Sequence, residues 1–434
     1  MEYWDPVETL AREELGSLQL RLLNETLHHA TCNSPYYAAS IPRDLRSLTS
    51  LEDIAKLPSL SKDDIRVDQE ARPPLGNMVA VPEDEVVYIS ASSGSTGVPT
   101  ASPFTSKDFD EWIDFEARLF FSSGLRRHHR YCHALNFSLF VGGPCVLGAQ
   151  RIGALSIHAG TLPSERLIMV IDQFKPDTIW TTPSYAWYLG ETAERMGFDP
   201  VASSIKRIFV AGEPGGSIEN TRKRIENLWD ANLYDYYGIS DIFGACAGEC
   251  TEKAGLHVAE DHLLVEVVDL KTGEHVAEGE RGEMYLTTLK KRARPLIRFR
   301  TGDIVSYEEE RCACGRTHLR LMGIHGRVDD MLIIKGVNVM PSAIEAIVRS
   351  NSALTGEYRL VVTRENHLDA LTVETEHVKS FKGNLGVLEK QIQGDIKATL
   401  GISPRVVVYD EDTLPRATHK AKRIVDHRKD VWKP

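Results

Sequence analysis

Three short apolar runs, DTIWT (177–181), IKRIFV (205–210) and LYDYY (233–237), decide the fold expected for this chain. Each run has the length and the β-branched or aromatic content of a buried strand. The intervening stretches 185–196 and 218–229 have the length and composition of helices. Strands that alternate with helices in this way predict a parallel βαβαβ unit, with a ligand crevice at the carboxyl ends of its strands.

The regions on either side of this unit differ from it in pattern. Residues 1–75 have the pattern of helices and turns, with a helix cap expected at Ser61. Residues 258–310 hold short strand-like runs separated by turn formers. A strand at 331–334, a helix that opens at Pro341 with a capping box, further strands and one long helix follow. The expected fold class is α/β: a large N-terminal domain with parallel βαβ sheets plus a β-rich subdomain, and a small α+β C-terminal domain.

Length, charge and cysteine content exclude several classes of protein. The 434 residues exceed the size at which one hydrophobic core stops growing, so at least two domains are expected. The net charge of −11 argues against nucleic acid or an anionic membrane as partner, because both require a basic surface. No signal peptide or membrane-spanning run is visible, so a cytoplasmic location is expected. Seven cysteines, an odd number, do not indicate a disulfide framework.

A loop rich in hydroxyls and glycines follows a strand-like run near residue 90. Residues 88–100 read YISASSGSTGVPT. The backbone N–H groups and hydroxyls of such a loop can wrap a phosphate, and its glycines let the backbone approach closely. The lysine and the spacing of a Walker A motif are missing, and a polar surface turn is the alternative interpretation. The candidate phosphate ligands are Ser92, Ser93, Gly94, Ser95, Thr96 and Gly97.

Five further segments, in matching order, make the chain resemble the acyl-adenylate-forming enzymes. They are GEP (212–214), DYYGISD (235–241), RTGD (300–303), GRVDDMLIIKG (326–336) and LPRATHKAKR (414–423). A TGD or a GR alone is weak evidence, whereas six motifs in register over residues 88–423 are specific. Within that superfamily the chain is most similar to the phenylacetate-CoA ligase family, through residues 329–339 and the compact spacing from Pro415 and Arg416 to Lys420.

This resemblance implies that ATP converts a carboxylic acid to acyl-AMP and that the acyl group then passes to a thiol, with ATP, Mg²⁺ and CoA as cofactors. It implies an adenylate-forming (AMP-binding) domain over 1–328 and a mobile C-terminal domain over 329–434. The small domain would rotate about Asp329 and would carry the catalytic Lys420, for which a solvated basic tail is the alternative interpretation. Asp303 would accept hydrogen bonds from the ribose hydroxyls.

The residues implied by the resemblance fall into three groups. A carboxylate that attacks ATP meets a polyanion, so cations must neutralise charge in the transition state. The residues implied as catalytic are Lys420, Arg327 and Asp241, the last as the Mg²⁺ ligand. Beside the phosphate loop, the implied nucleotide contacts are Gly212, Glu213, Pro214, Asp235, Tyr236, Tyr237, Gly238, Ser240, Asp303 and Arg327. The implied CoA contacts are Lys335, Gly336 and Val337.

Three positions depart from the family pattern. Val98 stands where relatives usually carry lysine, which removes a charge that would steer pyrophosphate. Asp241 stands where glutamate is usual, so the carboxylate for Mg²⁺ is kept but its reach is shorter by one methylene. His419 replaces the usual glycine before the lysine, and nothing in the sequence explains it. These departures predict a changed rate or geometry of activation.

A separate group of cysteines and one histidine lies in the β-rich region. Three thiolates and one imidazole make the closed tetrahedral set of a structural zinc site. The resemblance supports zinc, because phenylacetate-CoA ligases often carry cysteines and a histidine at these places. Cys246 is a competing ligand, and reduced cysteines that merely pack are the alternative. The predicted zinc ligands are Cys250, His257, Cys312 and Cys314.

The acid is expected between the βαβ region and residues 133–143. Aromatic side chains there would flank a flat ring, glycines leave room for it, and polar groups would hydrogen-bond a ring substituent. A pocket with such polar groups rejects the bare ring, so the sequence predicts a substituted aryl acid of the hydroxy- or aminobenzoate type. The predicted pocket residues are His133, Asn136, Phe137, Phe140, Gly142, Ala211, Tyr236 and Gly238.

Several alternatives stay open at this point. CoA is the acceptor thiol by resemblance, but the phosphopantetheine of a carrier protein is chemically the same thiol. The oligomeric state is open, with a homodimer as one candidate. A non-catalytic nucleotide binder and a purely structural zinc protein are the competing classes of function. A Lys420→Ala variant separates enzyme from binder, because only an enzyme would lose adenylation while still binding ATP.

Overall fold

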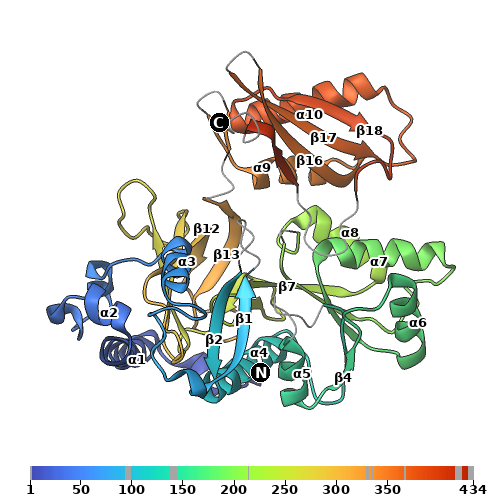
Figure 1. Ribbon diagram of the computed structural model, residues 1–434. Coiled ribbons are helices and arrows are strands. Elements are labelled where there is room, and N and C mark those ends of the chain that lie inside the picture. The colour runs from blue at the N-terminus through green and yellow to red at the C-terminus, as the bar shows by residue number, and fades with distance from the viewer. Residues whose placement is uncertain are drawn as a thin grey trace.

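The computed structural model describes residues 2–92, 99–135, 144–213, 215–328, 332–334, 337–365, 368–415 and 423–428. Figure 1 shows a larger body that ends with β13 and a smaller one, from α9 onward, that lies above it. Within the described ranges, no helix combines the length and the apolar content that crossing a membrane requires.

The N-terminal region is helical, as predicted. The side chain of Ser61 accepts a hydrogen bond from Asp64 N, and the Asp64 carboxylate accepts one from Ser61 N, so the expected cap is confirmed. Leu23 and Leu27 are fully buried in the main core. The elements of this region are α1 (Arg12–Asn33), α2 (Pro35–Ser40), α3 (Lys62–Ala71), the hairpin of β1 (Val86–Ser92) and β2 (Thr100–Thr105), and α4 (Ser106–Ser122).

The predicted βαβαβ unit is confirmed and is part of a larger parallel sheet with strand order β7-β6-β5-β3-β4. Ile179 of β5 packs in the core beneath α6 and α7, and Trp180 packs on the opposite face with α4. Burial of both faces is typical of parallel sheets. The strands are β3 (Arg130–His133), β4 (Leu155–His158), β5 (Thr178–Thr181), β6 (Arg207–Val210) and β7 (Asn232–Ile239). The helices are α5 (Cys145–Ile152), α6 (Ser164–Phe174), α7 (Pro183–Arg195) and α8 (Glu219–Trp229).

The predicted β-rich region is also confirmed, and it is continuous with the parallel strands. β7 pairs in parallel with β6 and antiparallel with β8. Among the described residues this gives one 11-stranded sheet, in the order β10-β11-β12-β13-β9-β8-β7-β6-β5-β3-β4. The antiparallel strands are β8 (Gly244–Glu249), β9 (Leu256–Val258), β10 (Leu263–Val268), β11 (Gly282–Thr288), β12 (Phe299–Glu308) and β13 (Arg320–Arg327).

The C-terminal part is a small α+β body with a hydrophobic core of its own. Leu360, Val373 and Ile392 are fully buried in this core. Its main sheet has the order β18-β17-β16-β19. The elements are β14 (Leu332–Ile334), β15 (Val337–Val339), α9 (Pro341–Ser350), β16 (Leu354–Glu365), β17 (Leu368–His377), α10 (Leu385–Leu400), β18 (Arg405–Tyr409) and β19 (Ile424–Asp426).

The capping box predicted at the start of α9 is wrong. The N-cap residue is Met340, and no side chain caps the helix there. Ser342 Oγ instead donates to the backbone oxygen of His325 in β13 at 2.6 Å, and Glu345 pairs with Arg349 one turn later at 2.8 Å. Ser342 thus makes a tertiary contact that links the small body to the large one, and Glu345 makes an ion pair within its own helix.

Candidate active site

An aspartate, a tyrosine and an arginine meet where β7, β12 and β13 come together. Asp303 lies opposite Arg327 in the register of β12 and β13, and Arg327 Nη1 donates to Asp303 Oδ1 at 2.8 Å. The Tyr237 hydroxyl donates to Oδ2 of the same carboxylate. Burial, reinforced by the charge of Asp303, raises the pKa of Tyr237 well above its usual value, so this hydroxyl is a neutral donor. A carboxylate offers about four lone-pair positions, enough for protein donors and a ligand hydroxyl together.

The neighbouring residues of β7 face different sides of the sheet. Because successive side chains of a strand point to opposite faces of the sheet, Tyr236 and Tyr237 point to different faces. The ring centre of Tyr236 lies 4.9 Å from that of Trp180, and its hydroxyl lies 2.5 Å from Ser123 Oγ. Gly238 follows at a register shift, and a Cβ atom there would lie 2.0 Å from the backbone oxygen of Gly244. This position therefore requires glycine, and Tyr236 belongs to the core side of the sheet.

The segment after β6 contacts the first turn of α7. The backbone N–H of Ser184 donates to Glu213 Oε1 at 2.7 Å, and the Ser184 hydroxyl donates to the same atom. Burial raises the pKa of Glu213. Ala211 is half-buried, and Gly212 is exposed with a φ of 92°. The carboxylate of Glu213 is thus already hydrogen-bonded to Ser184. A ligand would therefore meet mainly the backbone of this segment.

Asp235 is buried in the middle of β7. Burial, followed by the charge of Glu249, raises the pKa of Asp235 to about 8. Glu249 accepts a hydrogen bond from Asp235 N at 2.8 Å and pairs with Arg222 at 2.7 Å. A Cβ atom at Gly216 would lie 2.2 Å from Asp235 Oδ1, so the chain approaches this carboxyl closely. Asp235 is a neutral acid at pH 7.

Asp241, the sequence-based Mg²⁺ ligand, lies in the turn after β7, next to the half-buried Ser240. Its side chain is 1% exposed, with Lys62 Nζ 3.3 Å from Oδ2 and Arg294 Nη2 4.0 Å from Oδ1. The hydroxyl of Thr100 donates to Oδ1 over 3.5 Å. A carboxylate beside a hydroxyl suits Mg²⁺, which takes oxygen ligands, provided that the exposed Lys62 moves when the ion binds.

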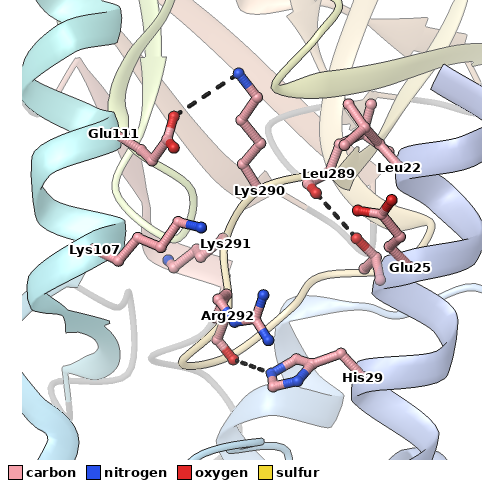
Figure 2. Close-up of a pocket in the computed structure, with 10 residues that line it drawn as sticks. Leu22, Glu25, His29, Lys107, Glu111, Leu289, Lys290, Lys291 and Arg292 are labelled. Atoms are coloured by element: carbon pink, nitrogen blue, oxygen red, sulfur yellow. Dashed lines mark hydrogen bonds and ion pairs between the residues drawn. The ribbon is translucent and has the colours of Figure 1, made fainter. Parts of the chain in front are cut away.

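Sequence analysis missed the cations around Asp241. Lys291 Nζ donates to the backbone oxygens of Asp241 and Ile242 at 2.9 and 3.0 Å, and burial lowers the pKa of Lys291 to about 7. Lys291 also lines a cavity of about 170 Å³ between α1, α4 and the chain after β11. Figure 2 shows this cavity, with Lys107 and Arg292 beside Lys291. Lys291 thus connects the cavity wall to the Asp241 turn, and no signal in the sequence separates these cations from the other Lys and Arg residues.

Two buried ring nitrogens lie at the carboxyl ends of β3 and β5. His133 and Trp180 lie opposite each other in the strand register. Among the described residues, His133 Nε2 and Trp180 Nε1 have no hydrogen-bond partner, although both side chains are almost fully buried. Tyr131 contacts the other ring nitrogen of His133 at 3.0 Å, and burial lowers the pKa of His133 to about 3, so the imidazole is neutral. Tyr236 stacks edge-on against Trp180 on the same face of the sheet.

Many sequence-based site residues lie outside the described residues. For Ser92 and Val337 the structure describes only the backbone, in β1 and β15. The positions that lie outside are Ser93, Gly94, Ser95, Thr96, Gly97 and Val98 of the phosphate loop, Asn136, Phe137, Phe140 and Gly142 of the acid pocket, Pro214, Asp329, Lys335, Gly336, His419 and Lys420.

The four predicted zinc ligands are brought together. The ligand atoms of Cys250, His257, Cys312 and Cys314 all lie within 4.8 Å of one another, and all four residues are buried. Cys250 Sγ is 3.9 Å from Cys312 Sγ, and Cys314 Sγ is 3.5 Å from His257 Nε2. Tetrahedral bonds to zinc place two sulfurs about 3.8 Å apart and a sulfur and a nitrogen about 3.6 Å apart. Cys246 is not in this group, and its thiol lies 3.7 Å from the backbone oxygen of Gly244.

Comparisons with known proteins indicate AMP-binding enzymes for both the N-terminal and the C-terminal part of the chain. Residues 27–289 match the AMP-binding enzyme family, and residues 336–428 match the AMP-binding enzyme C-terminal domain. The phenylacetate-coenzyme A ligase of Aromatoleum evansii is 37% identical over 98% of this chain and 97% of that protein. The phenylacetate-coenzyme A ligase of Thermus thermophilus is 34% identical over 99% of this chain and 100% of its own length.

A solved structure also matches over nearly the full length. 2-Hydroxyisobutyryl-CoA ligase in the post-adenylation state, in complex with 2-HIB-AMP, superposes with a TM-score of 0.91 at 30% identity, covering 99% of this chain and 93% of that one. The same ligase in the thioesterification state, with CoA, gives a TM-score of 0.74, covering 99% and 94%. The TM-score to this ligase is far higher in its post-adenylation state than in its thioesterification state. The two bodies of this chain are therefore arranged much as in the post-adenylation state.

Proposed function

Because the chain belongs to the AMP-binding enzyme family, we propose that it activates an aryl carboxylic acid that carries a polar ring substituent. The chemistry at the family level is the ATP-dependent activation of an acid, followed by formation of a CoA thioester. Phenylacetate is the acid in the names of the full-length relatives, which supports an aromatic substrate. The proposed acid differs from phenylacetate, the acid in the relatives' names, by the polar substituent on its ring.

The pair of unpartnered nitrogens, His133 Nε2 and Trp180 Nε1, is the observation that carries this proposal. A buried polar group without a hydrogen bond costs about 1–3 kcal/mol. A ligand oxygen or nitrogen near these atoms would recover that energy, whereas an unsubstituted ring would leave both nitrogens unpaired. The rings of Trp180 and Tyr236 contact each other in the core beside these nitrogens. An acid with a hydroxyl or amino substituent therefore fits this end of the sheet better than a bare ring does.

In the first half-reaction, a carboxylate oxygen of the acid attacks the α-phosphorus of ATP. The bond from that phosphorus to the bridging oxygen breaks, and pyrophosphate leaves with the electron pair. In our proposal the ribose hydroxyls donate to Asp303, which Tyr237 and Arg327 hold in place. Mg²⁺ bound at Asp241 would neutralise phosphate charge. Lys420 is the proposed cation at the α-phosphate.

In the second half-reaction, the thiol of CoA attacks the acyl carbon, and AMP leaves. The C-terminal part would rotate about Asp329, so that Lys335, Gly336 and Val337 meet the thiol while Lys420 withdraws. Such a rotation must break the contacts that α9 makes with the large body. Two of them are the hydrogen bond from Ser342 Oγ to His325 and the one from Arg349 Nη1 to Thr221 Oγ1 at 3.3 Å. Both are polar, which favours rearrangement over rigid docking.

Zinc is the second part of the proposal. The separations within the group Cys250, His257, Cys312 and Cys314 match a tetrahedral zinc site, and no position is left for a substrate. A closed site of this kind contributes to stability and takes no part in the transfer of the acyl group. Zinc would connect β9 with the ends of β8 and β12.

Acid-dependent exchange of labelled pyrophosphate into ATP tests the proposed function. The acids to compare are phenylacetate, 3-hydroxybenzoate, 2-aminobenzoate and 2-hydroxyisobutyrate. We expect exchange with a polar aryl acid to exceed exchange with phenylacetate, and thioester to form when CoA is added. Better activation of phenylacetate than of any polar acid would refute the proposed substituent. Thioester formation on a carrier protein but not on CoA would favour the alternative acceptor.

A further inference from the structure

Lys62, in the first turn of α3, reaches the turn that holds Asp241. Its side chain is 40% exposed, and its ammonium lies 3.3 Å from Asp241 Oδ2. Thr100, which donates to the other oxygen of Asp241, pairs with Ser92 in the register of β1 and β2. Ser92 and Thr100 flank the hydroxyl- and glycine-rich loop in the sequence. The Lys62 ammonium is therefore placed at the base of the candidate phosphate site.

Two further basic side chains lie beside the Asp241 turn. Arg294 is 1% exposed and lies 4.0 Å from Asp241, and its Nε and Nη2 atoms have no hydrogen-bond partner within the part of the chain that the structure describes. Lys291 adds a third basic group that contacts the backbone of the same turn. Asp241 thus faces two cations, and two further carboxylates also act on the buried Arg294 and Lys291. Since Arg294 and Lys291 are enclosed, the exposed Lys62 is the cation whose side chain can turn toward a ligand.

The loop itself brings no cation. Residues 88–100 contain neither lysine nor arginine, and Val98 is apolar. Pyrophosphate leaves with additional negative charge, and groups that neutralise this charge lower the barrier of the step. A positive side chain is therefore needed from another segment, and α3 supplies one next to the strand ends that flank the loop.

We infer that Lys62 is a catalytic residue of the adenylation step, whose ammonium binds the β- and γ-phosphate oxygens of ATP and stabilises the leaving pyrophosphate. The inference rests on the proposed function. No covalent bond to Lys62 forms or breaks in this step. A divalent cation at Asp241 repels the ammonium, so binding of the metal–nucleotide complex favours its transfer from Asp241 to the phosphates.

The test replaces the charge and keeps the apolar stem, in a Lys62→Met variant. We expect acid-dependent pyrophosphate exchange to fall about 100-fold, the loss typical for one group that stabilises a transition state. Thioester formation from supplied acyl-AMP and CoA should stay at the wild-type rate, and Lys62→Arg should restore part of the exchange. The matched control is Lys56→Met, since Lys56 is an exposed lysine near α3 that pairs only with Asp53 among the described residues. This control should keep full exchange.

Nucleotide affinity gives a second readout that needs no acid. Lys62→Met should weaken binding of ATP with Mg²⁺ but leave binding of AMP unchanged, because AMP lacks the β- and γ-phosphates. Equal loss of ATP and AMP binding, or loss of both half-reactions, would make Lys62 a structural residue and overturn the inference. Unchanged ATP affinity and exchange would overturn it as well. If the wild-type chain activates no acid, the proposed function fails, while the ATP-to-AMP comparison still decides the role of Lys62.

Discussion

The Cys/His group and the charged group around Asp241 are built in opposite ways. The first uses two short sequence pairs, is buried on all sides, and has its four ligand atoms within 4.8 Å of one another. The second joins Lys62, Asp241 and Arg294 from three distant segments and contains an exposed lysine. The closed group suits a permanent ion that stabilises the fold, whereas the open group suits a charged ligand that arrives and leaves. Substitutions in the closed group should therefore act on stability, and substitutions around the nucleotide and acid sites should act on binding or activity.

Removal of one zinc ligand should have the largest effect, and it should act on stability. Cys314→Ser takes a thiolate from the group, and structural zinc contributes on the order of 10 kcal/mol in small domains. We expect loss of bound zinc by elemental analysis and a large fall in the thermal midpoint. Cys246→Ser is the matched control, because this thiol is equally buried but outside the group. A full zinc content in Cys314→Ser would contradict the assignment.

Substitution of Asp235 should alter how the stability of the folded protein depends on pH. Its folded-state pKa of about 8 lies above that of the unfolded chain, so only the unfolded state loses this proton between about pH 4 and pH 8. Stability therefore falls as the pH rises through this range and is flat above it. Asp235→Asn should reduce this fall by a few kcal/mol at most.

The measurement for Asp235→Asn is the thermal midpoint at pH 5.5 and at pH 8. The variant should gain stability relative to the wild-type chain at pH 8 and show a smaller difference between the two pH values. Glu219→Gln, a change at an exposed carboxylate, serves as the control. An identical pH dependence in Asp235→Asn and wild type would mean that Asp235 is ionised in the folded protein.

Asp303→Asn should weaken nucleotide binding without unfolding the chain. The change keeps the shape of the side chain but removes the charge that accepts from Tyr237 and Arg327. Hydrogen bonds to charged groups contribute about 1.5–3 kcal/mol, which is about 10- to 100-fold in affinity for AMP. Titration calorimetry with AMP measures this loss. Asp269→Asn, in an exposed turn, should bind normally, and normal binding by Asp303→Asn would remove Asp303 from the ribose site.

Trp180→Phe should have the smallest effect, and it should act on the choice of acid. The substitution removes one N–H group and keeps an aromatic ring on β5. We expect the preference for a polar aryl acid over phenylacetate to fall about 10-fold, as the loss of one neutral hydrogen bond implies. The ratio of kcat/KM values for the two acids measures this. An unchanged ratio would mean that Trp180 does not contact the substituent.

Features that depend on residues close together along the chain could be predicted from the sequence. Runs such as 177–181 and 205–210 are short, apolar and flanked by helical stretches, and they form β5 and β6. The cap at Ser61 depends on one residue three positions later and was predicted correctly. The grouping of the three cysteines with His257 was also predicted, because Cys312 and Cys314 share one turn and only two further residues had to be placed.

Features that depend on distant contacts could not be predicted in this way. The ion pair between Lys62 and Asp241 joins residues 179 positions apart, and nothing in the sequence around Lys62 distinguishes it from other lysines. The unpartnered nitrogen of Trp180 is visible only once its neighbours are placed. The capping box at α9 failed for a related reason, since Ser342 finds a partner in β13 instead of its own helix.

Acid-dependent pyrophosphate exchange by the wild-type chain decides whether the proposed function is right, with hydroxy- and aminobenzoates compared with phenylacetate. We predict exchange that depends on Mg²⁺ and is greater for a polar aryl acid than for phenylacetate, with thioester formed on addition of CoA. No exchange with any acid, while ATP still binds, would contradict it and would identify the chain as a nucleotide binder.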